Sequence, residues 1–377
     1  MDEDGIPENE VIKELEARRK KDLTYSGGRI LSSMCSSPHP LVKKLYPMFL
    51  ETNLGDPGLF KGTRELEAEA VRIIGSLMGH SGARGFILSG GTEANLTALW
   101  IARNRMRRPY PEVIVPESAH FSLDKAADLL GIKAVKAPLL PDHSVDSEKV
   151  AELVTENTVA LVGIAGSTEY GAVDDIEALS EIALEAGLHL HVDAAFGGFV
   201  LPFLRDLGYD SRPFDFSVPG VSSITVDPHK MGLAAIPAGA LLLRESAMLR
   251  AIETPSPYLT ERKQHTITGT RSGAPASTVY ALLRHMGRRG YRRNVERCMM
   301  VTLHMYNELR SMGLRVEKPW MNVLVFKDEG GKVRKALMEK GWVLSRTRKG
   351  EARIVVMPHV TRDTAQALIK DLRDILG

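Results

Sequence analysis

The 377-residue sequence is poor in cysteine and aromatic residues and has no excess of charge of either sign. Its two cysteines, Cys35 and Cys298, cannot form a disulfide framework, which favours a reducing cytoplasm. The 49 basic residues nearly balance the 47 acidic ones, which argues against nucleic acid as a partner. No apolar run approaches the roughly 20 residues of a membrane span, and the start MDEDGIPENE is too acidic for a signal peptide. These absences predict a globular cytoplasmic protein with no membrane partner.

The chain length suggests more than one domain, because a single domain commonly has about 150 residues. We expect an N-terminal arm at 1–50, a large domain at 51–275 and a small α+β domain at 276–377. The arm combines a charged helical stretch at 10–22 with a segment rich in Ser, Gly and Pro. The small domain is expected to contain a long helix from 276 towards 312, followed by two strands and two shorter helices.

Short apolar runs alternate with helical patterns through the large domain. Seven candidate strands lie at 86–88, 113–115, 134–137, 159–164, 188–192, 223–226 and 240–243. Helical patterns at 92–105, 123–130, 147–154 and 176–186 separate most of them. This alternation predicts an α/β fold with a seven-stranded, mostly parallel sheet that is covered on both faces. A short loop without a helix joins the last two strands, which allows one of them to run antiparallel.

A lysine follows the strand at 223–226, in the run S-I-T-V-D-P-H-K-M-G. Lys230 stands where open parallel sheets bind their ligands, and a lysine there can form a Schiff base with a carbonyl group. His229, directly before it, can contact a phosphate or a ring. The alternative is a solvated lysine in an ordinary turn between a strand and a loop.

An aspartate ends the strand at 188–192, in the run H-L-H-V-D-A-A-F-G-G. Asp193 could hold a flat cationic ring, with the small Ala195 leaving room for it. A second interpretation is a metal site, because His189, His191 and Asp193 alternate and so share one face of the strand. A third is that His189 is simply a histidine satisfied by hydrogen bonds.

Two more strand ends carry polar groups. In L-S-G-G-T-E-A-N, Gly90 and Gly91 let backbone N–H groups approach an anion at the start of a helix, and Thr92 adds a hydroxyl. In P-E-S-A-H-F-S, His120 could stack on an aromatic cofactor. The first motif could instead be an ordinary turn capped by Thr92, and His120 could be a surface histidine. Together, however, an anion cradle, an imidazole, a carboxylate and a lysine fit a phosphate, a pyridine ring and an aldehyde, which pyridoxal phosphate unites.

The motifs S-G-G-T-E-A-N, H-V-D-A-A-F-G-G and D-P-H-K-M-G, with E-T-N-L-G-D-P-G-L-F-K-G-T and P-Y-L-T, resemble the group II pyridoxal-phosphate decarboxylases. Among these, the archaeal L-tyrosine/L-aspartate decarboxylases are the most similar type, and the resemblance covers nearly the whole chain, from about residue 22 to 358. It implies a fold-type-I homodimer with its active sites at the subunit interface.

The resemblance also implies a role for each matching residue. Lys230 would bind the cofactor aldehyde, Asp193 the pyridine nitrogen and Arg353 the substrate's α-carboxylate, while Tyr258 or His120 would supply a proton to Cα. The other cofactor contacts would come from Gly91, Thr92, Thr168, Ala195, His229 and Thr270, the last from the second subunit. No metal is implied. Arg353 also has the plain interpretation of a surface ion-pair partner, and Tyr258 that of a packing residue.

The substrate implied by the resemblance is an L-amino acid. Tyrosine would yield tyramine for methanofuran, and aspartate would yield β-alanine for coenzyme A. Aspartate would require a second cation, for which Arg271 is the candidate, and Asn53 could line the same pocket. Rival interpretations are a tRNA-dependent sulfhydrylase, a phospholipid-base lyase of the sphingosine-phosphate lyase type, and a metal-dependent or non-catalytic protein.

Overall fold

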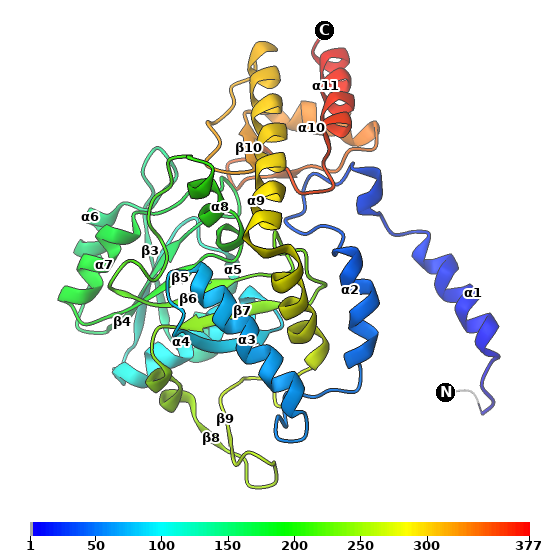
Figure 1. Cartoon of the computed structure of the whole chain (residues 1–377). Coiled ribbons are helices and arrows are strands. Elements are labelled where there is room, and N and C mark those ends of the chain that lie inside the picture. The colour runs from blue at the N-terminus through cyan, green and yellow to red at the C-terminus, as the bar shows by residue number, and fades with distance from the viewer. Residues whose placement is uncertain (1–2) are drawn as a thin grey trace.

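The computed structural model describes residues 3–377 and has a seven-stranded sheet at its centre (Figure 1). The strand order is β1-β7-β6-β5-β4-β2-β3. The seven strands are β1 (Arg84–Leu88), β2 (Glu112–Pro116), β3 (Lys133–Ala137), β4 (Thr158–Ile164), β5 (His189–Asp193), β6 (Val221–Val226) and β7 (Gly239–Leu243). All are parallel except β7, which is antiparallel to both β1 and β6. The predicted α/β fold and its seven mostly parallel strands are confirmed.

Helices cover both faces of this sheet, as the continuous apolar runs of its strands require. In β2, Val113 and Val115 belong to the apolar cluster formed with α4 and α5, whereas Ile114 belongs to the cluster formed with α7. This alternation follows from the two-residue period of a strand. The helices of this layer are α3 (Lys61–Leu77), α4 (Gly91–Met106), α5 (Phe121–Leu130), α6 (Ser147–Leu153), α7 (Ile176–Glu185) and α8 (Leu201–Asp206).

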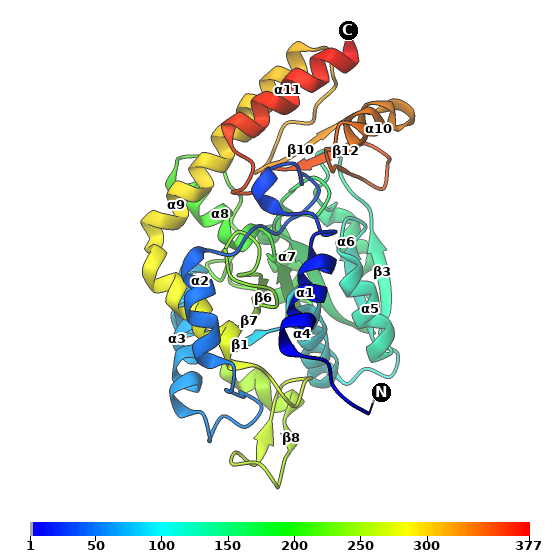
Figure 2. The same cartoon turned by 90° about the vertical axis from the view of Figure 1, so that its right-hand side faces the viewer.

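A smaller three-stranded sheet lies above the large one in Figure 2. Its strand order is β10-β12-β11. Helix α9 packs against α3 beside the large sheet and reaches β10 of the small one, with a break at Gly287, whose φ is 55°. The elements are α9 (Gly273–Ser311), β10 (Val323–Phe326), α10 (Lys332–Glu339), β11 (Ser345–Arg346), β12 (Ala352–Val355) and α11 (Arg362–Leu376). The sequence pattern had predicted each of these except β11, which is only two residues long.

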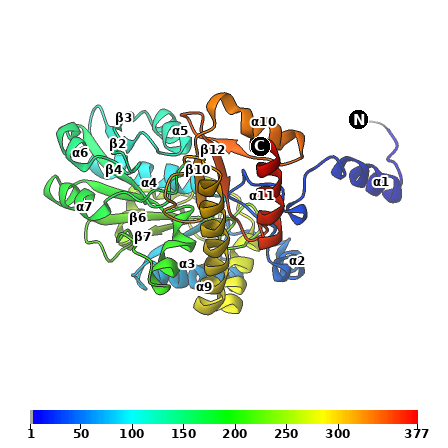
Figure 3. The same cartoon turned by 90° about the horizontal axis from the view of Figure 1, so that it is seen from above.

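The N-terminal region, which the sequence predicts to be an arm at 1–50, has two parts in the described residues. Helix α1 (Glu8–Arg19) buries none of its residues and stands apart from the body in Figures 1 and 3. Residues further along belong to the body, because Leu31 donates its N–H to the carbonyl of Val343 at 2.8 Å and Ile30 bridges to the same residue. Helix α2 (Pro40–Leu45) packs against α9.

A two-stranded hairpin, β8 (Thr254–Pro255) with β9 (Lys263–Gln264), extends from the lower end of the molecule in Figures 1 and 2. Tyr258 lies in its loop with 86% of its surface exposed. No strand is predicted here from the sequence pattern, since Pro and Lys are uncommon in strands and each strand has only two residues. Among residues 3–377, no helix has both the length and the apolar character needed to cross a membrane.

Candidate active site

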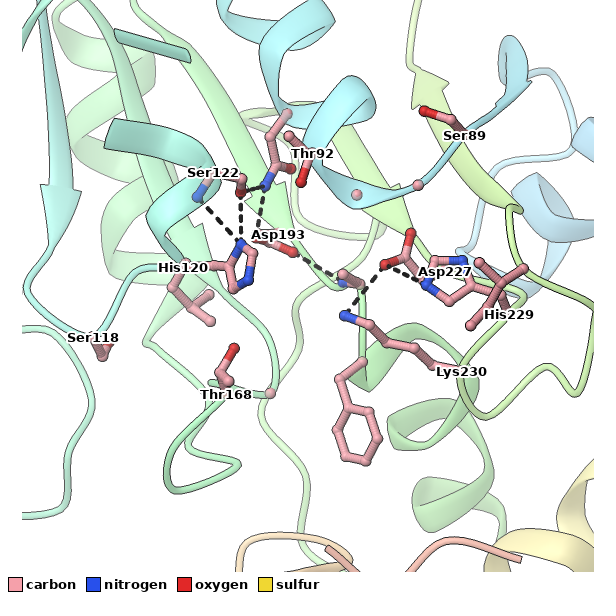
Figure 4. A pocket seen from close by; sticks show the side chains of 18 residues that line it. Ser89, Thr92, Ser118, His120, Ser122, Thr168, Asp193, Asp227, His229 and Lys230 are labelled. Atoms are coloured by element: carbon pink, nitrogen blue, oxygen red, sulfur yellow. Dashed lines mark hydrogen bonds and ion pairs between the residues drawn. The ribbon is translucent and has the colours of Figure 1, made fainter. Parts of the chain in front are cut away.

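The ends of the parallel strands surround a cavity of about 440 Å³ (Figure 4). Eight residues predicted from the sequence line it together: Gly91, Thr92, His120, Thr168, Asp193, Ala195, His229 and Lys230. They come from chain segments up to 139 residues apart, and the strand order brings them to one edge of the sheet. Figure 4 shows His120 on one side of the cavity and Lys230 on the other, with Asp193 between them.

The start of α4 forms an anion cradle. Gly90 is its N-cap and offers no side chain to the free N–H groups of the first turn, so these groups can bind an anion. The backbone here is tightly packed, because a Cβ atom on Gly239 would lie 2.4 Å from the Cα atom of Gly90. A Cβ atom on Gly91 would lie 3.0 Å from the Asp227 carboxylate, so glycine keeps this part of the cavity open.

Lys230 follows β6 and points into the cavity. Its Nζ atom lies 3.2 Å from Oδ2 of Asp227, and Nε2 of His229 lies 3.6 Å from the same oxygen. Asp227 is buried, and its Oδ1 atom has no hydrogen-bond partner among residues 3–377. The sequence interpretation gave Asp227 no role, although this residue stands in the D-P-H-K motif. The contact with Asp227 holds the Nζ atom of Lys230 at the cavity.

Asp193 lies at the end of β5 and is fixed on both of its oxygens. Oδ1 accepts the N–H of Ala195 at 3.0 Å, and Oδ2 accepts the amide of Asn95 at 2.9 Å. The same amide nitrogen of Asn95 donates to Oγ of Ser122 at 3.0 Å. Asn95 was missed in the sequence, because its partner Asp193 lies 98 residues away. These bonds hold the carboxylate in one orientation.

His120 caps α5 and faces the cavity. Its Nδ1 atom accepts the backbone N–H of Ser122 at 3.3 Å and lies 2.9 Å from the Ser122 hydroxyl. Burial lowers the pKa of His120, an effect that Asp193 opposes. The ring is therefore neutral at pH 7, and its proton is on Nε2 because Nδ1 is an acceptor.

The metal interpretation is wrong for the histidines of β5. Oγ of Ser223 lies 2.7 Å from Nε2 of His189 and 2.8 Å from Nδ1 of His191, while Nε2 of His191 lies 3.0 Å from Oδ1 of Asn95. These rings form a buried hydrogen-bonded chain behind Asp193 instead of converging on one point. Within residues 3–377, no three or more His, Cys, Asp or Glu side chains form a group that could hold a metal ion.

These two buried histidines predict a loss of stability in mild acid. Burial lowers the pKa of His189 to about 3 and that of His191 to about 4, from an ordinary value of 6.5. Above pH 6.5 both rings are neutral in the folded and the unfolded chain, and their contribution to stability is complete. As the pH falls from 6.5 towards 4, only the unfolded chain gains the protons, so the folded state loses stability relative to it. Each ring should reduce the free energy of unfolding by about 1.4 kcal/mol per pH unit in that range.

We expect His189→Gln, which keeps a nitrogen near Ser223 but does not titrate, to remove about 1.4 kcal/mol per pH unit from this slope. Urea unfolding at a series of pH values between 4 and 6.5 measures it. An unchanged slope in the variant would contradict a neutral His189 in the folded protein.

The remaining predicted residues lie outside the cavity lining. Thr270 lines a separate hollow near Glu93, and Tyr258 is exposed in the hairpin loop. The guanidinium of Arg271 is buried in an ion pair with Glu67 at 2.7 Å and donates to the carbonyl of Ile87. Oδ1 of Asn53 accepts the N–H groups of Gly55 and Arg271. In this chain both side chains hold loops together, and the substrate roles expected for Arg271 and Asn53 stay predictions.

Comparison with known proteins gives the same class as the geometry. Residues 62–326 match the pyridoxal-dependent decarboxylase conserved domain, and the chain belongs to this family of pyridoxal-phosphate-dependent decarboxylases. The chain is 49% identical to the probable L-tyrosine/L-aspartate decarboxylase of Methanothermobacter thermautotrophicus, over 94% of this chain and 99% of that protein. It is 47% identical to the L-aspartate/L-glutamate decarboxylase of Pyrococcus horikoshii, over 99% and 98% of the two chains.

Solved structures share the fold. The sphingosine-1-phosphate lyase of Burkholderia pseudomallei superposes with a TM-score of 0.91 at 30% identity, over all of this chain and 92% of that one. The glutamate decarboxylase of Lactobacillus brevis gives a TM-score of 0.90 at 22% identity, over all of this chain and 93% of that one. The second likeness shows the fold alone.

The cavity fits the family's cofactor, pyridoxal phosphate. The uncapped N–H groups at the start of α4 and the hydroxyl of Thr92 are phosphate ligands by chemistry. The carboxylate of Asp193 suits a protonated pyridine nitrogen, and Lys230 is an amine that can join an aldehyde. The hydroxyl of Ser118, which also lines the cavity, has no partner within the described chain and is available to a bound group.

Proposed function

We propose that this decarboxylase acts on L-aspartate, L-tyrosine or both, and releases carbon dioxide from the α-carboxylate. The observation that supports the proposal most directly is the meeting of Lys230, Asp193 and the uncapped end of α4 in one cavity. The curated relatives at 46–50% identity are named for aspartate, tyrosine or glutamate, which indicates the substrate class. The products would be β-alanine for coenzyme A or tyramine for methanofuran.

Each side chain in the cavity has a separate task. When bound, pyridoxal phosphate supplies an aldehyde and a ring that accepts the electrons of the bond broken at Cα. Lys230 provides the amine for the aldehyde, and Asp193 keeps a positive charge favourable at the ring nitrogen. Ala195 would leave space for a flat ring, and the Nε2 proton of His120 would be available to donate. Thr168 would lie near an edge of the ring, and His229 would help to hold the phosphate.

Arg353 is proposed to bind the substrate's α-carboxylate. It is buried at the small sheet, where its side chain donates to Oγ of Ser345 at 3.0 Å and to the carbonyl of Ser32 at 3.4 Å. Its Nε atom has no hydrogen-bond partner in the part of the chain that the structure describes. Burial lowers the pKa of Arg353 to about 10, so the guanidinium stays charged at pH 7. A buried cation that lacks a full set of acceptors is suited to a carboxylate.

The proposal also includes a homodimer. Helix α1 has no buried residue, and Tyr258 is exposed on the hairpin that extends from the lower end of the molecule in Figure 1. A second copy would cover the helix and receive the hairpin, so that Tyr258 and Thr270 would reach the partner's site. The two cysteines, Cys35 and Cys298, are free, which supports a cytoplasmic location.

Product analysis tests the substrate proposal. The purified protein with pyridoxal phosphate is incubated with L-aspartate, L-tyrosine or L-glutamate, and the amine product is measured by mass spectrometry together with carbon dioxide. We expect β-alanine or tyramine to form in equal amounts with carbon dioxide. Absence of both amines would contradict the proposal. Cleavage of a phosphorylated sphingoid base would instead favour the lyase interpretation, and modification of an acylated tRNA would favour the sulfhydrylase.

A further inference from the structure

Arg348 lies at the tip between β11 and β12 and contacts the large-sheet part of the molecule at several points. Its guanidinium donates to the main-chain carbonyls of Glu117 and Ala119, the second at 2.9 Å. Its Nε atom lies 3.1 Å from Oε1 of Glu169, and its backbone N–H donates to Oε2 of the same carboxylate at 3.0 Å. One residue thus binds two separate loops, 117–119 and the turn that holds Glu169.

The tip that presents Arg348 is itself well ordered by hydrogen bonds. The N–H of Thr347 donates to the carbonyl of Glu351 at 2.9 Å, and its hydroxyl donates to the carboxylate of Glu351 at 3.0 Å. The same carboxylate accepts the hydroxyl of Tyr170 at 2.6 Å. Tyr170 follows Glu169, so the tip holds this loop by two neighbouring residues. These bonds hold the backbone of the tip in place, so Arg348 is presented from a fixed segment.

Both loops lead directly into the cavity. Ala119 precedes His120, and Glu169 follows Thr168, while Arg353 stands on β12, five residues after Arg348. The bonds of Arg348 therefore join the strand that carries Arg353 to the two loops that carry His120 and Thr168. This geometry fixes the position of the small sheet relative to one side of the cavity.

We propose that Arg348 is a positioning residue that aligns Arg353 with His120 and Thr168. The inference rests on the proposed function, because the roles of those three residues belong to it. The side chain of Arg348 is 56% exposed, and an exposed ion pair alone contributes little. Arg348 also donates to two main-chain carbonyls, so the contact does not depend on the ion pair alone. A planar guanidinium can hold several acceptors in fixed directions, whereas an ammonium group cannot.

The first test needs no substrate and no cofactor. In the cofactor-free protein, Arg348→Ala should speed hydrogen exchange of the backbone in peptides covering 117–122 and 168–171 by about tenfold, because a loop that loses its tertiary hydrogen bonds opens more often. Arg346→Ala is the matched control, since Arg346 is an exposed arginine of the same hairpin with no side-chain bond within the described chain. Equal exchange in the wild type and Arg348→Ala would overturn the proposal.

The second test separates positioning from general stability. With activity normalised to bound cofactor, Arg348→Ala should lower kcat by about tenfold and change KM much less, because misalignment affects the reacting geometry. Arg348→Lys should recover only part of the rate, and Arg346→Ala should match the wild type. An unchanged kcat, or full recovery with lysine, would overturn the alignment role. If the wild type itself acts on none of the amino acids, the substrate proposal fails while the exchange result still decides the loop contacts.

Discussion

Lys230→Ala is expected to release no measurable carbon dioxide, a fall in rate of about 10³-fold or more. The reason is that an alanine cannot provide the amine that joins the cofactor aldehyde, and no other lysine lines the cavity among the described residues. The wild-type protein should be yellow, and treatment with borohydride should bleach it and attach the cofactor to a peptide containing Lys230. Carbon dioxide release and peptide mass spectrometry measure these two results.

Two controls separate this loss from a change in folding. Lys230→Arg keeps a positive charge beside Asp227 but cannot form the Schiff base, so it should also be inactive. Its unfolding midpoint should be closer to that of the wild type than the midpoint of Lys230→Ala is. Lys149→Ala removes an exposed lysine paired with Glu152 at 2.8 Å and should leave the rate unchanged. Substantial turnover by Lys230→Ala without an added amine would refute the assignment.

Asp193→Asn is expected to lower kcat by about 10²-fold or more, an effect in the range of removing a positioned acid–base group. A neutral amide no longer favours a protonated ring nitrogen, and the ring then accepts electrons less well. The substitution also leaves one donor facing another, because the two oxygens of Asp193 accept N–H groups from Ala195 and Asn95. The absorption spectrum of the bound cofactor across a pH series should change together with the rate.

Asp328→Asn provides the matched control. Both oxygens of Asp328 accept backbone N–H groups, from Val333 at 2.9 Å and Arg334 at 3.1 Å, at the start of α10. Asp328→Asn therefore also places an amide N–H group opposite a backbone N–H group, but Asp328 caps a helix of the small-sheet region and does not line the cavity. We expect Asp328→Asn to lower the unfolding midpoint and to keep the wild-type kcat. Wild-type activity in Asp193→Asn would contradict the ring orientation proposed for the cavity.

Local pattern was enough to predict the large sheet. Buried parallel strands have continuous apolar runs, and each of the seven was placed within about two residues of its observed bounds, consistent with the usual uncertainty of element ends. The antiparallel strand followed from the short link before β7. The grouping of Gly91, His120, Asp193 and Lys230 also followed, because residues after parallel strands meet at one edge.

Contacts between distant segments could not be predicted in this way. Asn95 and Arg348 bond partners 98 and 229 residues away, and such pairs depend on strand order and on how the small sheet packs. Arg271 was assigned to the substrate because it adjoins a motif, yet its partner Glu67 lies 204 residues away. A charged residue near a motif does not reveal whether its charge is already matched.

The strand order also has a consequence for biosynthesis. In the large sheet β1 pairs only with β7, and Gly239 of β7 packs against Gly90 in the phosphate cradle. A ribosome must therefore translate about 150 further residues after Gly90 before that corner of the sheet can close, and contacts so distant along the chain slow folding. A nascent polypeptide that ends before β7 should be unable to bind pyridoxal phosphate, so we expect the cofactor to bind only after the sheet is complete.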